Sequence, residues 1–195
     1  MTNTENKDAI LGNMVTAVNL LEKCTEFACL VPEVRVNLAY ALPEAASRQD
    51  VAAVEGRITV VGGLPRASGL PAFGASDHMA RLIIEIRKYD ASINAGINFK
   101  CNEKIIEAVK NYCNEHQLLF GWIDRSREPD EVIGQDGASM PWKIAELVGS
   151  SGGVPRLFYE GRGWGKEPLF VAVGKNAVEV ASIAIDVSKR LRAGF

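Results

Sequence analysis

The sequence has little histidine and no paired cysteine motif. Only two histidines, His78 and His116, occur in 195 residues. The four cysteines form no Cys-x-x-Cys motif, and none lies at zinc-ligand spacing from a histidine, which argues against a zinc site. We therefore expect the cysteines to be small buried side chains in a reducing compartment.

Excess charge of one sign and long hydrophobic segments are also missing. The net charge is −2 and no run of lysine and arginine occurs, so nothing favours nucleic acid as a partner. The apolar runs are far shorter than a membrane span, and the polar N-terminus MTNTENKDAI is unlike a signal peptide. We expect a cytoplasmic protein that binds neither nucleic acid nor membranes.

The sequence does contain an alternation of helix-like and strand-like segments. Helical periodicity occurs over residues 8–28, 77–89, 103–115, 142–148 and 176–192. Strands are predicted for residues 34–42, 57–61, 93–100, 118–123, 154–159 and 169–173. This pattern indicates an α/β fold, with a layered sheet of mixed strands and helices packed on its faces. The length suits one domain over residues 1–195, with residues 1–30 as an N-terminal amphipathic helix packed on it.

A segment rich in glycine and proline leads into the second of these helices. Its composition predicts that residues 69–74 form no regular element. Ser76 is expected to cap the helix, and Asp77 places a carboxylate in the first turn, where the helix dipole favours it. His78 therefore lies at a helix N-terminus, where unpaired backbone N–H groups bind anions. From the local sequence alone, a histidine that only hydrogen-bonds a carbonyl explains this position slightly better.

A second glycine-rich segment lies between the last two predicted strands. Residues 161–166 contain three glycines together with Arg162 and Lys166, and backbone N–H groups beside such cations bind phosphate. The segment is not a Walker A loop, because Glu167 follows Lys166 where serine or threonine is required. The alternative is a flexible hairpin turn with solvated charges. Two glycine-rich segments of this kind in one α/β domain favour a phosphorylated small-molecule ligand.

Polar side chains also occur within and beside the predicted strands. Asn37 lies inside a predicted strand, which indicates either the wet face of an edge strand or a group that faces a pocket. Arg57 begins the next predicted strand, where a solvated charge is the simplest explanation. Asp124 and Arg125 directly follow a predicted strand, at the sheet edge where open α/β sheets bind ligands.

Several short motifs follow one another from about residue 20 to the last helix. They are Val36-Asn-Leu-Ala-Tyr-Ala-Leu-Pro43, Gly56-Arg57-Ile58, Phe73-Gly-Ala-Ser-Asp-His78, Asn98-Phe-Lys100, Asp124-Arg125 with Glu128-Pro129, and Gly165-Lys-Glu-Pro168. In this order they resemble the archaeal-type thiamine-phosphate synthase domain, the ThiN family. One departure from the family pattern is Ile123, where an aromatic residue is expected.

The resemblance implies an enzyme that joins hydroxymethylpyrimidine diphosphate to a thiazole phosphate, with thiamine phosphate and pyrophosphate as products. It also implies that Arg57 and His78 are the catalytic residues. We expect Arg57 to contact the diphosphate and His78 to hydrogen-bond or protonate the leaving group. The alternative is a non-catalytic domain that senses thiamine phosphate, but the presence of both Arg57 and His78 favours the enzyme.

Further residues are expected to bind the substrates of this reaction. The candidates are Asn37, Ser76, Asn98, Asp124, Arg125, Arg162, Gly165 and Lys166. Arg162 and Lys166 are expected to hold the thiazole phosphate or the product phosphate. Asn37 and Asn98 are expected to contact the edge of the pyrimidine.

Magnesium and a second copy of the chain are the remaining expected partners. Mg²⁺ is expected to bridge the diphosphate with few protein ligands, and Asp124 or Glu167 is the candidate carboxylate. A monomer and a homodimer both stay open, since apolar helices offer surfaces that can pair across a two-fold axis.

Overall fold

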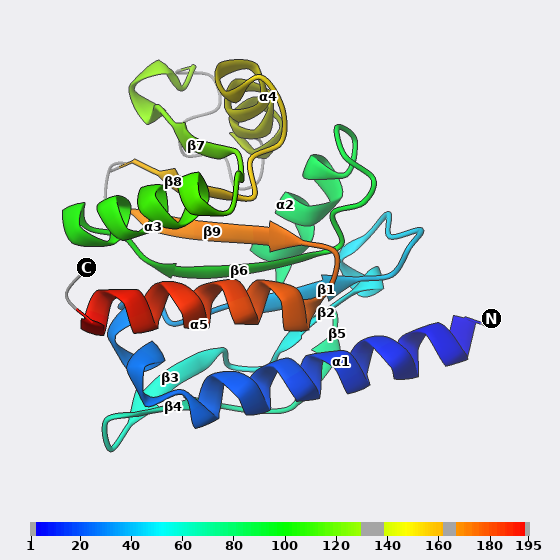
Figure 1. The fold of residues 1–195 in the computed structure, drawn as a ribbon. Helices are drawn as coiled ribbons and strands as arrows, with labels where there is room; N and C mark the ends of the chain where they lie inside the picture. Colours follow the sequence, from blue (N-terminus) through cyan, green and yellow to red (C-terminus); the bar gives the residue numbers. More distant parts are fainter. Residues whose placement is uncertain (1–2, 130–138, 162–166, 194–195) are drawn as a thin grey trace.

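A seven-stranded sheet forms the centre of the computed structural model, which describes residues 3–129, 139–161 and 167–193 (Figure 1). Its strands follow the order β5 (Pro71–Phe73), β2 (Val51–Val54), β1 (Leu38–Ala41), β6 (Ala95–Lys100), β9 (Leu169–Gly174), β8 (Leu157–Glu160) and β7 (Phe120–Ile123). All neighbouring strands are antiparallel except β7 and β8, which are parallel. The predicted α/β class with a mixed sheet is therefore confirmed.

Helices cover both faces of the sheet (Figure 1). One face carries α1 (Asn3–Lys23), α3 (Glu103–Glu115) and α5 (Ala177–Ala193), and the other carries α2 (Asp77–Ile86) and α4 (Ser139–Ser151). Each face has its own apolar core, because the strands are buried on both sides. Phe27, Phe99 and Phe170 belong to the first core, whereas Met79 and Phe158 belong to the second.

The predicted helix caps explain where several helices begin. The Ser76 hydroxyl accepts a hydrogen bond of 3.3 Å from the Met79 backbone N–H, which caps α2. Asn102 caps α3 in the same way through the Ile105 N–H, at 3.0 Å. The side chain of Asn176 caps α5. These polar side chains satisfy N–H groups that have no partner within the helix.

The N-terminal part of the chain differs from the expected helix over residues 1–30. The α-helix ends at Lys23, and a 3-10 helix, η1 (Thr25–Leu30), follows it. Cys24 separates the two because its backbone is extended, with φ −91° and ψ 97°. No described helix is both long enough and apolar enough to cross a membrane.

The segment between β2 and α2 contains more regular structure than its composition predicts. The predicted lack of regular structure over residues 69–74 is wrong, because β5 lies there, and β4 (Leu64–Ala67) precedes it. β4 pairs with β3 (Ile58–Val61) in a separate two-stranded sheet, joined by Gly62 and Gly63 with φ of 59° and 80°. A pair of glycines with positive φ is the usual connection of a tight hairpin. The strand β2 was also missed, because Val-Ala-Ala-Val is buried on both faces and shows no alternation.

The cysteines follow the expectation with one exception. All four thiols are free, and Cys24, Cys101 and Cys113 are buried. Burial raises the pKa of the Cys101 and Cys113 thiols to about 11, which leaves them protonated and inert. Cys29 is exposed, so the expectation of burial is wrong for this residue.

One end of the sheet brings together chain segments that are far apart in the sequence. β1 begins there and β6 ends there, because Leu38 pairs with Ile97. β7 and β8 also end there, with Ile123 beside Glu160. Two 3-10 helices, η2 (Arg48–Asp50) and η3 (Arg125–Arg127), complete the described elements. The candidate site residues of the central strands are thus gathered at this one end of the sheet.

Candidate functional site

Two cavities with a shared wall lie at this end of the sheet. The first, here named the arginine cavity, has a volume of about 570 Å³, and its lining includes Arg35, Gly56, Ser76 and Asp77. The second, the ion-pair cavity, has a volume of about 350 Å³, and its lining includes Asn98, Arg125, Lys143, Glu160 and Glu167. The shared wall consists of Val34, Asn37, Arg57 and His78, which line both cavities.

His78 lies in the first turn of α2, as predicted, and is exposed. The N-cap Ser76, two residues earlier, is held by the Asn37 side-chain amide, whose nitrogen donates to its hydroxyl at 2.7 Å. Asp77 forms an ion pair of 2.9 Å with Arg81 on the same helix, so its carboxylate is already matched. The histidine is thus fixed at a helix N-terminus whose dipole favours a bound anion.

Arg57 is positioned by an unusual backbone turn. Gly56 has φ 65°, and a Cβ atom there would lie 2.8 Å from Cβ of Ser68, so only glycine fits. Arg57 itself has φ 70°, which is uncommon for a residue with a side chain. Its Nη1 donates to the Val34 carbonyl oxygen at 2.5 Å. Backbone strain of this kind is frequent at functional sites, where binding or catalysis can offset its cost.

Asn37 and Asn98 are both buried and bonded to each other. The Asn37 backbone N–H donates to the Asn98 side-chain oxygen at 2.5 Å, and the Asn98 side-chain nitrogen donates to the Arg35 carbonyl at 3.3 Å. Asn98 therefore uses both amide atoms to fix the chain before β1. Asn37 Oδ1 is buried and has no hydrogen-bond partner in the described part of the chain. Contact of either residue with a pyrimidine stays a prediction.

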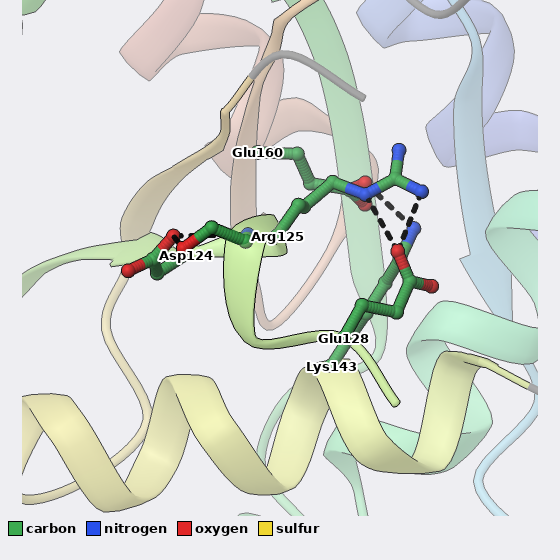
Figure 2. Close-up of polar contacts among 6 residues, drawn as sticks. Asp124, Arg125, Glu128, Lys143 and Glu160 are labelled. Atoms are coloured by element: carbon green, nitrogen blue, oxygen red, sulfur yellow. Dashed lines mark hydrogen bonds and ion pairs between the residues drawn. The ribbon is translucent and has the colours of Figure 1, made fainter. Parts of the chain in front are cut away.

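Two buried ion pairs line the ion-pair cavity (Figure 2). Arg125 donates to Glu128 through Nε and Nη2, at 3.0 and 2.7 Å. Lys143, only 3% exposed, lies 2.7 Å from the Glu160 carboxylate. Burial alone would raise the pKa of Glu160, but Lys143, His78 and Arg125 together hold that pKa below its usual value. Of the cations that line only this cavity, Arg125 and Lys143 each have a carboxylate partner, whereas Arg57 in the shared wall has none among the described residues.

Three functional candidates were missed from the sequence: Arg35, Lys143 and Glu160. A signal for Lys143 does exist, because it lies on the apolar stripe of α4 with Met140, Ile144 and Leu147. A charged residue on a buried helix face requires a partner, and that partner is Glu160. Arg35 offered no such signal, since it occupied the polar face of a predicted strand.

The two alternative metal-ligand candidates have different surroundings. Asp124 accepts hydrogen bonds from the Ser126 N–H and hydroxyl, at 3.0 and 2.6 Å, and lines neither cavity. Figure 2 shows its carboxylate directed away from Arg125. Glu167 lines the ion-pair cavity and accepts from the backbone N–H groups of Glu33 and Val34, at 3.4 Å each. Among the described residues, no three His, Cys, Asp or Glu side chains are grouped to hold a metal.

Arg162, Gly165 and Lys166 lie outside the described residues. Their expected contact with a phosphate stays a prediction. The residues on either side, Gly161 and Glu167, both line the ion-pair cavity.

Relatives match this chain over nearly all of its length. The sequence model of the family described as "Thiamine-phosphate synthase ThiN" matches residues 13–186. The chain is 37% identical over 182 residues to the thiamine-phosphate synthase ThiN of Methanothermobacter thermautotrophicus, which covers 93% of this chain and 94% of that protein. It is 33% identical over 177 residues to the bifunctional thiamine biosynthesis protein ThiDN of Methanocaldococcus jannaschii, covering 90% of this chain and 39% of that protein.

A solved structure supports the same relationship. The C-terminal domain of a phosphomethylpyrimidine kinase superposes with a TM-score of 0.87 and 33% identity, covering 95% of this chain and 99% of that domain. The family model, the curated relatives and the superposition therefore agree over the sheet, its helices and the edge that carries both cavities. The chain belongs to the thiamine-phosphate synthase ThiN family.

Proposed function

We propose that the protein is a thiamine-phosphate synthase, a transferase that joins hydroxymethylpyrimidine diphosphate to hydroxyethylthiazole phosphate. The observation that carries the proposal is the shared wall of the two cavities, formed in part by Arg57 and His78. An enzyme that couples two substrates needs adjacent compartments, with the reacting atoms meeting where they join. Membership of the ThiN family supports the same reaction.

The difference in charge between the cavities supports one arrangement of the two substrates. In the described part of the chain, neither Arg35 nor Arg57 forms an ion pair with a carboxylate. The arginine cavity therefore suits the diphosphate, the more highly charged group. The ion-pair cavity, where Arg125 and Lys143 are paired and Leu169 and Val171 are apolar, suits the thiazole ring and its single phosphate.

The chemistry then requires stabilisation of the leaving group. The thiazole nitrogen donates its lone pair to the pyrimidine methylene carbon and forms a C–N bond. The C–O bond to the diphosphate breaks, and pyrophosphate leaves with that electron pair. The neutral nitrogen needs no general base. Arg57 and His78 would donate hydrogen bonds to the oxygens on which negative charge builds, which is the dominant form of catalysis for such a step.

Magnesium is expected to arrive with the diphosphate. The described residues do not fit a resident magnesium site, since no three possible ligands are grouped there and Asp124 and Glu167 each accept hydrogen bonds from backbone N–H groups. Mg²⁺ is commonly bound through substrate phosphates and water with few protein ligands. Mg²⁺ would therefore accompany the diphosphate and would not occupy a site built by the protein alone.

Oligomeric state and location are also proposals. The apolar side chains of Val15 and Leu20 on α1 are exposed, at 43% and 38%, which supports a homodimer that sedimentation would detect. The free thiols support a reducing, cytoplasmic compartment.

A direct synthase assay tests the proposed function. Purified protein is supplied with both substrates and Mg²⁺, and thiamine phosphate and pyrophosphate are measured. We expect both products, with turnover reduced at least 100-fold in His78→Ala and Arg57→Gly. Glycine is chosen at position 57 because it keeps the positive φ, and Arg66→Gln is the control outside both cavities. If the protein binds thiamine phosphate tightly but shows no turnover, the proposed synthase function is rejected in favour of a ligand-sensing domain.

A further inference from the structure

Arg35 and Arg57 are linked by a reciprocal pair of hydrogen bonds. The Arg57 guanidinium donates to the carbonyl oxygen of Val34, the residue before Arg35, at 2.5 Å. The Arg35 guanidinium donates to the carbonyl oxygen of Gly56, the residue before Arg57, at 3.3 Å. Each arginine thus orients the turn that carries the other, so the two side chains form one unit.

The backbone around both arginines is held in place from several directions. Val36 and Ile58 exchange two backbone hydrogen bonds of 2.9 Å, which join the two turns just beyond the arginines. The Arg35 carbonyl accepts from the Asn98 side chain at 3.3 Å. Arg35 has φ 67° and Arg57 has φ 70°, a conformation that favours glycine. Two neighbouring arginines are therefore kept where glycine would be more stable.

The charges of these two arginines are not matched within the described residues. Arg125 and Lys143 in the neighbouring cavity each have a carboxylate partner, but Arg35 and Arg57 have only carbonyl oxygens. Asp77, the acidic residue in the described lining of the arginine cavity, forms an ion pair with Arg81. Two like charges that line one cavity repel each other unless an anion binds between them. Each guanidinium group has five N–H donors, and the described hydrogen bonds use one of them. The remaining N–H donors are available to a ligand.

We propose that Arg35 is a second substrate-binding residue, which together with Arg57 contacts the diphosphate of the pyrimidine substrate and the pyrophosphate product. The assignment to this substrate rests on the proposed synthase function. The ligand chemistry, an inorganic or organic diphosphate, rests on the arginine cavity itself. A diphosphate offers two phosphoryl groups, so each arginine can contact one of them with charge-assisted hydrogen bonds.

Calorimetric titration with inorganic pyrophosphate tests this proposal without turnover. We expect Arg35→Gln to weaken pyrophosphate binding by about tenfold to a hundredfold, since a hydrogen bond to a charged group is lost. Arg35→Gly should weaken binding equally while its melting temperature is unchanged or raised, because glycine favours φ 67°. Arg66→Gln is the matched control, because Arg66 also donates to carbonyl oxygens but lines neither cavity.

Steady-state kinetics separates a contact with the diphosphate from a structural role. Both Arg35 variants should raise KM for the pyrimidine diphosphate by a similar factor and leave KM for the thiazole phosphate unchanged. Unchanged pyrophosphate affinity in Arg35→Gly would overturn the proposal, and so would an equal loss in Arg66→Gln. A wild-type protein that makes no thiamine phosphate but binds pyrophosphate through Arg35 would reject the synthase and retain the diphosphate site. Turnover that does not respond to the Arg35 variants would retain the synthase function and reject Arg35 as a diphosphate-binding residue.

Discussion

The side-chain nitrogen of Asn37 donates a hydrogen bond of 2.7 Å to the hydroxyl of Ser76, and this bond joins the start of β1 to the start of α2. Both residues are buried. The same hydroxyl accepts from the Met79 N–H and so caps the helix that carries His78. One serine side chain therefore sets the position of His78 relative to the central sheet.

Replacement of Ser76 by alanine should affect both stability and turnover. The helix loses its cap, and the Asn37 amide loses its partner, so we expect a loss of about 1–3 kcal/mol in unfolding free energy. Turnover should fall as well, because a displacement of about 1 Å in a catalytic group can reduce the rate by about 100-fold. Urea unfolding and the synthase assay measure the two effects. Ser47→Ala, at an exposed serine, should change turnover little.

Local patterns in the sequence were sufficient to place several site residues. Ser76 was predicted as an N-cap from its position before an apolar helical stripe, and the structure confirms this cap. The same argument placed His78 at the helix N-terminus. Arg125 was predicted at a ligand-binding sheet edge, and it does line a cavity there. These features depend on residues close together in the chain, which is the information that periodicity and capping carry.

Features that depend on distant segments were not predicted. The strand expected over residues 34–42 begins only at Leu38, because the left-handed backbone of Arg35 turns the chain away from it. Nothing in the sequence near Arg35 signals this turn, which depends on Asn98 and on the pairing of Val36 with Ile58. Asp124 follows β7 at the expected edge, but its carboxylate caps a 3-10 helix, so it does not reach a cavity.

Loss of one member of the pair between Lys143 and Glu160 should be strongly destabilising. Either Lys143→Met or Glu160→Leu leaves the other charge buried without a partner, which costs about 3–5 kcal/mol. The double replacement Lys143→Met with Glu160→Leu should cost less than the two single changes together. Unfolding free energies at pH 7 complete this double-mutant cycle.

The double variant also separates stability from binding. If Lys143 contacts the thiazole phosphate, KM for that substrate should rise in the double variant even though the fold is retained. A double variant with normal KM would make the pair purely structural. The exposed pair between Arg127 and Glu146, at 3.1 Å, is the matched control, and its removal should change neither quantity appreciably.

The same pair gives stability a defined dependence on pH. The folded pKa of Glu160 lies below its ordinary value of 4.5, so its stabilising contribution is complete above that pH. The contribution is lost as the pH falls through the folded pKa, because the carboxylate must then be protonated. The stability difference between wild type and Glu160→Gln should therefore shrink below about pH 4.5. Urea unfolding from pH 7 to about pH 3 measures it, with Glu146→Gln as control; a constant difference would contradict the prediction.

Magnesium should bind measurably only when a diphosphate is present. The described residues offer no group of three potential ligands, and both expected carboxylates already accept backbone hydrogen bonds. Titration of the ligand-free protein with MgCl₂ should thus give no heat of specific binding, whereas addition of pyrophosphate should make binding of either ligand dependent on the other. Because Asp124 caps η3 and lies outside both cavities, Asp124→Asn should leave the magnesium dependence of turnover unchanged. A shifted dependence in this variant, or tight Mg²⁺ binding without diphosphate, would instead place a resident metal site on the protein.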